Sequence, residues 1–131
     1  MFLLDTNICI YMINKNPKKV LEKINGLSPL DVKISSITVA ELEYGASKSL
    51  NREKNKNSLK RFLSPFEILN FDTIDAEIYG IIRADLEKKG IIIGPYDLQL
   101  AAQALRWDYT FITNNIKEFK RITGLKLENW T

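Results

Sequence analysis

The stretch FLLDTNICIYM (residues 2–12) places an acidic residue between a short apolar run and an amphipathic segment. Residues 2–4 have the apolar character of a buried strand, and Thr6 is expected to cap a helix that runs through Met12. Asp5 directly follows the strand, and no lysine or arginine stands beside it in the sequence. A partly buried charge persists only where it is paired, hydrogen-bonded or bound to a metal. The stretch therefore predicts a strand leading into a helix and marks Asp5 as a candidate functional residue.

The same alternation of strand and helix continues along the chain. Further strands are expected at residues 32–36, 67–71, 110–113 and 125–127. Helices are expected at residues 18–24, 38–47, 51–63, 72–89 and 98–105, and in a short basic segment ending at residue 119. Strands that alternate with helices predict an α/β fold, here a three-layer α/β/α sandwich around a mostly parallel central sheet.

Length and composition limit the possible classes of protein. A chain of 131 residues with 45% hydrophobic and 27% charged residues is typical of one globular domain, residues 1–131. It contains no histidine and one cysteine, Cys9, which excludes an intramolecular disulfide, zinc sites built from histidine and cysteine, and catalytic triads that need histidine. The N-terminus lacks a basic segment followed by a long apolar run, so we expect a cytoplasmic protein.

Basic residues concentrate in one part of the chain. Between Lys48 and Arg61 there are six basic residues and a single acid, whereas the net charge of the whole chain is only +3. That net charge is too small by itself to indicate an anionic partner. The basic run is either the solvated face of a helix or a surface that contacts phosphates.

Acidic and amide side chains recur where expected strands give way to helices. They are Asp5, Glu41, Asp97, Asn114, Asn115 and Glu118. Because the carboxyl ends of parallel strands share one edge of the sheet, these side chains are expected to converge there. Glu41 alone also has a structural interpretation, as the acceptor of a capping box opened by Thr38. Asp97 alone has one too, as an acid that favours the first turn of a helix.

A group of carboxylates at one edge favours metal-dependent chemistry. The charges repel one another, and a hard divalent cation such as Mg²⁺ or Mn²⁺, with oxygen ligands and retained water, compensates them. Such a metal lowers the pKa of a bound water and stabilises the charge of a phosphoryl displacement. It thereby replaces the missing histidines, and the residue pattern favours hydrolysis of a phosphodiester.

Four segments, in this order and spacing, resemble those of PIN-domain ribonucleases and, more narrowly, the VapC toxins of bacterial type II toxin–antitoxin operons. They are LLDTNI (residues 3–8), SSITVAELEYG (35–45), IGPYD (93–97) and TNNIKEF (113–119). The resemblance covers essentially the whole chain. It implies a metal-dependent endoribonuclease with Mg²⁺ as cofactor and Mn²⁺ as a substitute, which cleaves a tRNA or rRNA. It also implies a VapB-type antitoxin as partner, a homodimer, and a hetero-oligomer with the antitoxin.

The resemblance assigns the acidic residues to a metal site. Asp5, Glu41 and Asp97 match the three acidic metal-binding positions of the family. A fourth position is occupied by aspartate in many PIN domains and here by Asn115. Either Asn115 binds the metal, or Glu118 supplies the missing catalytic charge.

Supporting roles follow from the same resemblance. Side chains that would orient the carboxylates are those of Thr6, Asn7 and Thr113. Candidates for contacts with the RNA backbone are Lys48, Arg52, Lys117 and Lys120. Tyr44 and Tyr96 stand beside two of the acids, where a base could stack, but core packing is the favoured role for both.

Two alternatives compete with a metal-dependent ribonuclease. A phosphatase with an aspartyl nucleophile would have a second acid two residues after Asp5, where this chain has Asn7. A catalytically silent PIN-like module would bind RNA or protein without cleaving, but the three matching acids argue against it. Stabilisation by divalent metal against heat separates an intact acidic site from a silent module.

Overall fold

The computed structural model describes residues 1–131 and contains a five-stranded sheet in the order β3-β2-β1-β4-β5. The strands are β1 (Phe2–Leu4), β2 (Val32–Ser35), β3 (Glu67–Leu69), β4 (Thr110–Ile112) and β5 (Leu127–Glu128). All four pairings between neighbouring strands are parallel. The predicted α/β fold is confirmed, and the sheet is parallel throughout rather than mostly so.

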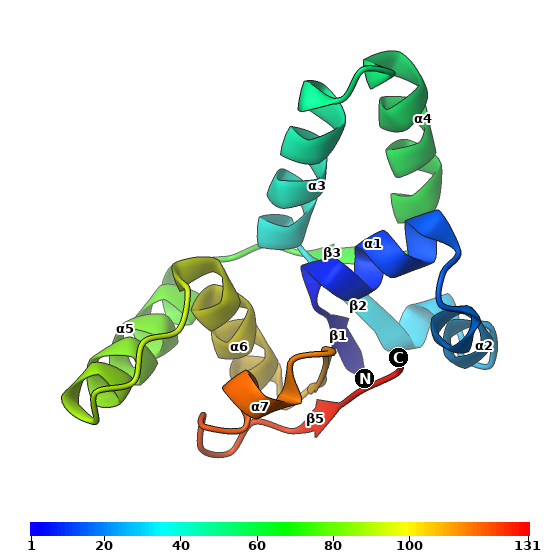
Figure 1. The fold of residues 1–131 in the computed structure, drawn as a ribbon. Coiled ribbons are helices and arrows are strands. Elements are labelled where there is room, and N and C mark those ends of the chain that lie inside the picture. Colours follow the sequence, from blue (N-terminus) through cyan, green and yellow to red (C-terminus); the bar gives the residue numbers. More distant parts are fainter.

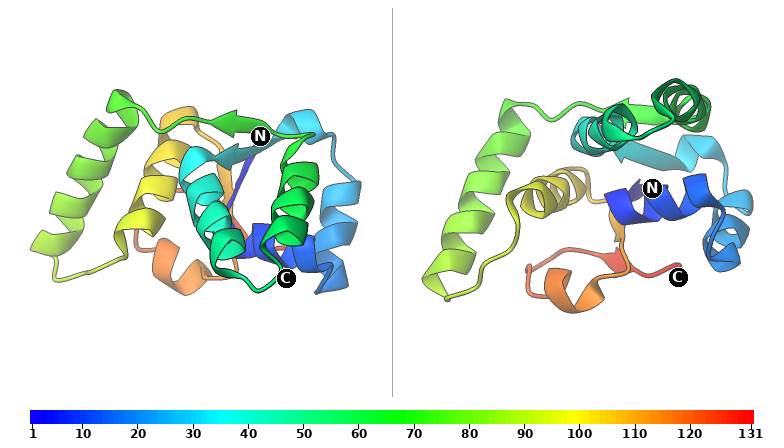
Figure 2. Two further views of the ribbon diagram at one scale, coloured as in Figure 1. Left: turned by 90° about the horizontal axis from the view of Figure 1, so that it is seen from above. Right: turned by 45° about the horizontal axis from the view of Figure 1, so that its top comes forward.

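Helices cover both faces of this sheet (Figures 1 and 2). They are α1 (Thr6–Asn14), α2 (Lys18–Asn25), the 3₁₀ helix η1 (Pro29–Asp31), α3 (Ser36–Lys48), α4 (Arg52–Leu63), α5 (Thr73–Lys88), α6 (Pro95–Trp107) and α7 (Ile116–Phe119). Residues of α1 to α4 pack in one hydrophobic core, and residues of α5 to α7 pack in another. None of these helices combines the length and apolar character that crossing a membrane requires.

The two cores arise from the alternation of side chains along the strands. Successive residues of a strand point to opposite faces of a sheet. Leu4 and Ile112 therefore pack with α1 to α4, whereas Leu3 and Phe111 pack with α5 to α7. All four side chains are fully buried. Because β1 is the central strand and is covered on both faces, its carboxyl end has a fixed position in the middle of the sheet edge.

Helices α3 and α4 form a hairpin that projects away from the sheet (Figure 1). At its base, Leu42 and Leu59 are buried in the same core as α1. An ion pair between Lys56 and Glu43, with 3.4 Å between Nζ and Oε2, joins the two helices further out. The hairpin thus forms one wall of the space beside α1.

Helix α3 begins differently from the prediction. Its N-cap is Ser35, whose side chain accepts a hydrogen bond of 3.0 Å from the backbone N–H of Ile37. Thr38 therefore lies inside the helix, and Glu41 lies in the second turn. The predicted capping box is wrong because Ser35, the last residue of β2, already has the extended backbone and hydroxyl that a cap requires.

Other elements also differ from the prediction, by one to three residues at their ends. Helix α1 is capped by Asp5, not by Thr6, since the Asp5 side chain accepts from the N–H of Thr6. The last strand is found at Leu127–Glu128, so it begins two residues later and ends one residue later than predicted, and it pairs with β4. The first difference matters for function, because the same carboxylate that caps α1 faces the site described next.

Candidate active site

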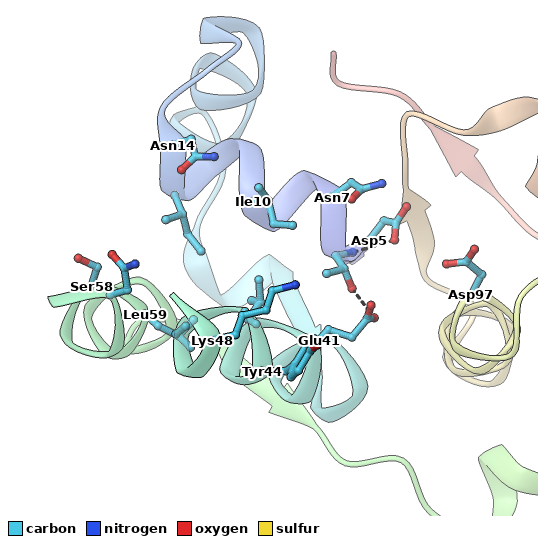
Figure 3. A pocket seen from close by; sticks show the side chains of 16 residues that line it. Asp5, Asn7, Ile10, Asn14, Glu41, Tyr44, Lys48, Ser58, Leu59 and Asp97 are labelled. Carbon is cyan, nitrogen blue, oxygen red and sulfur yellow. Dashed lines mark hydrogen bonds between the residues drawn. The ribbon is translucent and has the colours of Figure 1, made fainter. Parts of the chain in front are cut away.

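A cleft of about 590 Å³ lies at the carboxyl ends of β1 and β2, between α1 and the α3–α4 hairpin. Figure 3 shows the carboxylates of Asp5, Glu41 and Asp97 pointing toward the same space from three different elements. The wall away from these acids includes apolar side chains, among them Ile10, Ile13, Leu42 and Leu59. The cleft is therefore acidic at one end and lined along the rest by a mixture of apolar and polar side chains, the polar ones including Asn14, Asn55 and Ser58.

Asp5 is held by hydrogen bonds to both of its carboxylate oxygens. Its Oδ1 accepts from the backbone N–H of Thr6 at 2.7 Å, and its Oδ2 accepts from the hydroxyl of Thr113 at 2.8 Å. The Thr113 hydroxyl oxygen in turn accepts from the backbone N–H of Asn115 at 3.0 Å. Only 5% of Asp5 is exposed. The carboxylate is thus fixed in orientation, as the chemistry of a positioned ligand requires.

Glu41 reaches the same end of the cleft from α3. Its Oε1 accepts a 2.9 Å hydrogen bond from the hydroxyl of Thr6, which Figure 3 marks with a dashed line. The Thr6 hydroxyl also lies 3.0 Å from the hydroxyl of Thr38. Thr6 therefore contacts both carboxylates, Asp5 through its backbone and Glu41 through its side chain.

Asp97 enters from the first turn of α6 and is half-buried. Burial, and to a smaller extent the charges of Asp5, Glu118 and Glu41, raise the pKa of its carboxyl to about 6. The pKa of Asp5 is raised as well, chiefly by burial, although its hydrogen bonds from Thr113 and Thr6 oppose the rise. The charges of Glu41 and Glu118 add to it. The carboxylates at this end of the cleft therefore repel one another.

This donor set fits a hard divalent cation. Carboxylate oxygens are the ligands that Mg²⁺ and Mn²⁺ prefer, and a cation relieves the repulsion among the acids. In the side-chain positions of the structure, no three acidic residues come close enough to hold one ion together. Mg²⁺ commonly takes one or two carboxylates and keeps several waters, so the arrangement suits an ion bound partly through water.

The two candidates for the fourth position contact each other. The side-chain amide of Asn115 donates to the carboxylate of Glu118. Neither residue lines the cleft, but the charge of Glu118 raises the pKa of both Asp5 and Asp97. Glu118 thus acts electrostatically on Asp5 and Asp97 without lining the cleft, and Asn115 hydrogen-bonds the carboxylate of Glu118.

The other predicted residues divide into two groups. Thr6, Asn7 and Lys48 line the cleft, and Lys48 lies over the ring of Tyr44 with Nζ 4.7 Å from the ring centre. The side chains of Arg52, Lys117 and Lys120 are exposed and lie outside the cleft. Arg52 donates from Nε to the backbone oxygen of Ser47 at 2.9 Å. Of the four basic candidates, Lys48 alone therefore lines the cleft that contains the acids.

Two features of the site are missing from the sequence-based prediction. Tyr44 and Tyr96 are 67% and 60% exposed, so the prediction that both pack in the core is wrong. Both line a smaller hollow beside Glu41, at the N-terminal ends of α3 and α6. The second feature is Thr38, whose contact with Thr6 joins it to the acidic end of the cleft. Its position one turn before Glu41 was the only sequence signal for it.

Comparison with known proteins identifies similar chains over nearly the full length. The family model described as PIN domain matches residues 2–125. Ribonuclease VapC2 of Rickettsia felis is 48% identical over 130 residues, which is 98% of this chain and 97% of that protein. The tRNA(fMet)-specific endonuclease VapC of Salmonella typhimurium is 44% identical over 98% of this chain and 97% of its own length.

A solved structure extends the similarity to three dimensions. The chain superposes with a TM-score of 0.92 on a chain in the crystal structure of VapBC2 from Rickettsia felis, which is bound to a DNA fragment from the promoter. The two chains are 47% identical, and the match covers 99% of this chain and 98% of the other.

Proposed function

The chain belongs to the PIN-domain family and is similar to VapC ribonucleases over nearly its whole length, and on that premise we propose that it is the RNA-cleaving toxin of a toxin–antitoxin pair. Residues 1–131 form one catalytic domain in this proposal. The reaction is metal-dependent hydrolysis of a phosphodiester in a tRNA or rRNA. The observation that carries the proposal is the meeting of Asp5, Glu41 and Asp97, from three separate elements, at one end of a single cleft.

Asp5, Glu41 and Asp97 would hold the metal, Mg²⁺ or Mn²⁺, partly through its bound water, with Asn115 or Glu118 completing the acidic end. When bound, the metal supplies a water of lowered pKa and offsets the negative charge that develops on the phosphate. The protein's part is to keep the carboxylates in place. Thr113 and the backbone of Thr6 hold Asp5, and the hydroxyl of Thr6 holds Glu41.

Binding of the RNA backbone falls to basic side chains around the acids. Lys48 reaches into the cleft and is available to contact a phosphate next to the scissile bond. Arg52, Lys117 and Lys120 are exposed outside the cleft and would contact phosphates further along the strand. Repulsion between the acids and the RNA backbone makes such contacts necessary, since the acidic end by itself disfavours a polyanion.

The proposed partner is a VapB-type antitoxin. The support is the Rickettsia felis structure, in which a chain 47% identical to this one belongs to a VapBC complex on promoter DNA. The active form in this proposal is a homodimer that acts in the cytoplasm, and the inhibited form is a hetero-oligomer with the antitoxin.

Expression in a bacterial host tests this function. Induction of the wild-type chain is expected to arrest growth, and co-expression of the antitoxin encoded beside it is expected to restore growth. Asp5→Asn removes one acid of the cleft and should permit growth. Asp85→Asn is the matched control, because Asp85 is an exposed residue of α5 that pairs with Lys89, and it should arrest growth like the wild type. Growth arrest by Asp5→Asn at equal protein level would refute the proposal.

A further inference from the structure

Thr38 is a fully buried threonine of α3 whose hydroxyl lies 3.0 Å from the hydroxyl of Thr6. Its backbone is helical and does not cap α3, because Ser35 performs that function. The one side-chain hydrogen bond of its hydroxyl is the one to Thr6. Buried hydroxyls are normally hydrogen-bonded, and the single partner of this one connects Thr38 to the acidic end of the cleft.

The direction of the hydrogen bonds can be assigned from the chemistry of the groups. A hydroxyl has one proton to donate and two lone pairs to accept with. Thr6 donates its proton to Glu41, since an ionised carboxylate can only accept. The hydroxyl of Thr38 must then donate to the oxygen of Thr6. The three side chains therefore form a chain of two hydrogen bonds, from Thr38 to Thr6 and from Thr6 to Glu41, which we call the relay.

A parallel relay holds the other carboxylate. Asp5 accepts from the hydroxyl of Thr113, and the oxygen of Thr113 accepts from the backbone N–H of Asn115. In each case a threonine hydroxyl is oriented by a donor behind it and presents its proton to an acid. The donor behind Thr113 is a backbone group, whereas the donor behind Thr6 is the side chain of Thr38.

We propose that Thr38 is a positioning residue for Glu41, acting through the hydroxyl of Thr6. The hydrogen bonds alone support the role of Thr38 in positioning Glu41. The effect of this positioning on metal binding and cleavage rests on the proposed function. A glutamate side chain has several rotatable bonds, and fixing it costs conformational entropy. The hydrogen bonds from Thr38 to Thr6 and from Thr6 to Glu41 fix the Glu41 side chain in the folded protein before a metal or an RNA binds. Thr38 does this by keeping the Thr6 hydroxyl proton directed at Glu41.

Three variants separate positioning from a structural role. Thr38→Val keeps the shape of the side chain and removes the donor. Thr38→Ser restores the hydroxyl in a smaller side chain. Ser35→Ala removes the N-cap of the same helix and leaves the relay intact, so it reproduces any general effect of weakening α3. Should Thr38→Val fail to fold, Thr38→Ala removes the same hydroxyl and takes its place.

The first measurement is a crystal structure of each metal-free variant. The carboxylate of Glu41 is expected to leave Thr6 in Thr38→Val and to remain on it in Thr38→Ser and Ser35→Ala. A Glu41 that keeps its place in Thr38→Val overturns the proposal. This outcome does not depend on whether the protein is a ribonuclease.

The second measurement is calorimetric titration with Mn²⁺, alongside kcat and KM for RNA at saturating metal. Removing a group that orients a metal ligand typically weakens metal binding by about 10-fold or more, and we expect that loss in Thr38→Val with recovery in Thr38→Ser. The kcat should fall while the KM for RNA stays unchanged. Mn²⁺ binding by Thr38→Val equal to that of the wild type also overturns the proposal. Absence of Mn²⁺ binding and cleavage in the wild type would instead count against the proposed function, and the crystal structures would still decide the role of Thr38.

Discussion

The hydroxyl of Thr113 donates a 2.8 Å hydrogen bond to Oδ2 of Asp5, although the two residues are 108 positions apart in the chain. Each residue directly follows a strand, and the two strands, β1 and β4, pair in parallel with Leu4 opposite Ile112. The register of the central strands therefore sets the contact. The most buried acid of the cleft is fixed by the same hydrogen-bond pattern that builds the sheet.

Thr113→Val should lower both stability and cleavage. The variant loses the hydrogen bond to Asp5 and leaves the N–H of Asn115 without its acceptor. A lost buried hydrogen bond costs about 1–2 kcal/mol, so we expect the free energy of unfolding to fall by about that amount. Denaturation in urea measures it, and a cleavage assay measures the second effect. Thr110→Val, at the start of the strand β4 that Thr113 follows, serves as control, and equal values for the two variants would contradict the assigned role of Thr113.

Asp97→Asn is expected to stabilise the metal-free protein near neutral pH. The folded pKa of Asp97 is about 6. The unfolded pKa of an aspartate is about 3.9, so the folded state disfavours the ionised form. The cost of ionisation therefore appears as the pH rises from about 4 to about 6 and persists above that range. Because Asp97 is partly exposed, we discount the shift for solvent screening and expect about 1 kcal/mol.

Thermal denaturation in the presence of EDTA checks this prediction at pH 7.5 and at pH 4. Asp97→Asn should have the higher Tm at pH 7.5 and a Tm equal to that of the wild type at pH 4. If the Tm of Asp97→Asn exceeded that of the wild type by the same amount at both values of pH, ionisation of Asp97 would not be the cause of the difference.

We expect Glu118, rather than Asn115, to fill the role of the fourth acidic residue of the metal site. Glu118 carries the charge that acts on Asp5 and Asp97, and Asn115 contacts that charge through its amide. Glu118→Gln should therefore weaken Mn²⁺ binding and slow cleavage more than Asn115→Ala does. Titration calorimetry and initial cleavage rates measure the two effects, with Glu77→Gln on the exposed face of α5 as control. The reverse order would assign the position to Asn115.

Lys48→Gln is expected to weaken RNA binding without changing the chemical step. Lys48 lines the cleft, so the variant should raise KM for RNA and leave kcat unchanged. Each phosphate contact to a single strand contributes about 0.7 to the slope of log affinity against log salt concentration, and the slope should fall by about that amount. Lys88→Gln, on exposed α5, should behave like the wild type. An unchanged salt dependence in Lys48→Gln would remove Lys48 from the RNA-binding surface.

Much of the fold and the location of the acids could be predicted from the sequence. The run of apolar residues before Asp5 predicts a buried strand, and parallel strands bring their carboxyl ends to one edge. That rule places Asp5 and Glu41 near one another without any knowledge of side-chain conformation, but it does not place Asp97, because α6 follows α5 rather than a strand. Periodicity also predicted the helices to within a few residues, most clearly α5 and α6, which have apolar stripes.

What the sequence left undetermined depends on contacts between distant segments. The spacing of Thr38 and Glu41 fits a capping box equally well, and only the end of β2 at Ser35 shows that the cap lies earlier. The contact of Thr38 with Thr6, 32 residues away, has no local signal. Tyr44 and Tyr96 were expected in the core because aromatic residues usually pack there, yet their exposure depends on which face of α3 and α6 meets the sheet.

Cleavage of RNA by the purified protein tests the account most directly. Total tRNA and rRNA are incubated with the wild type, with Asp5→Asn, and with Asp85→Asn as matched control, each in Mg²⁺, in Mn²⁺ and in EDTA. We expect a discrete cut by the wild type and Asp85→Asn in either metal, and none in EDTA or with Asp5→Asn. A cut that persists in EDTA, or one made equally by Asp5→Asn, would contradict a metal-dependent reaction at this cleft.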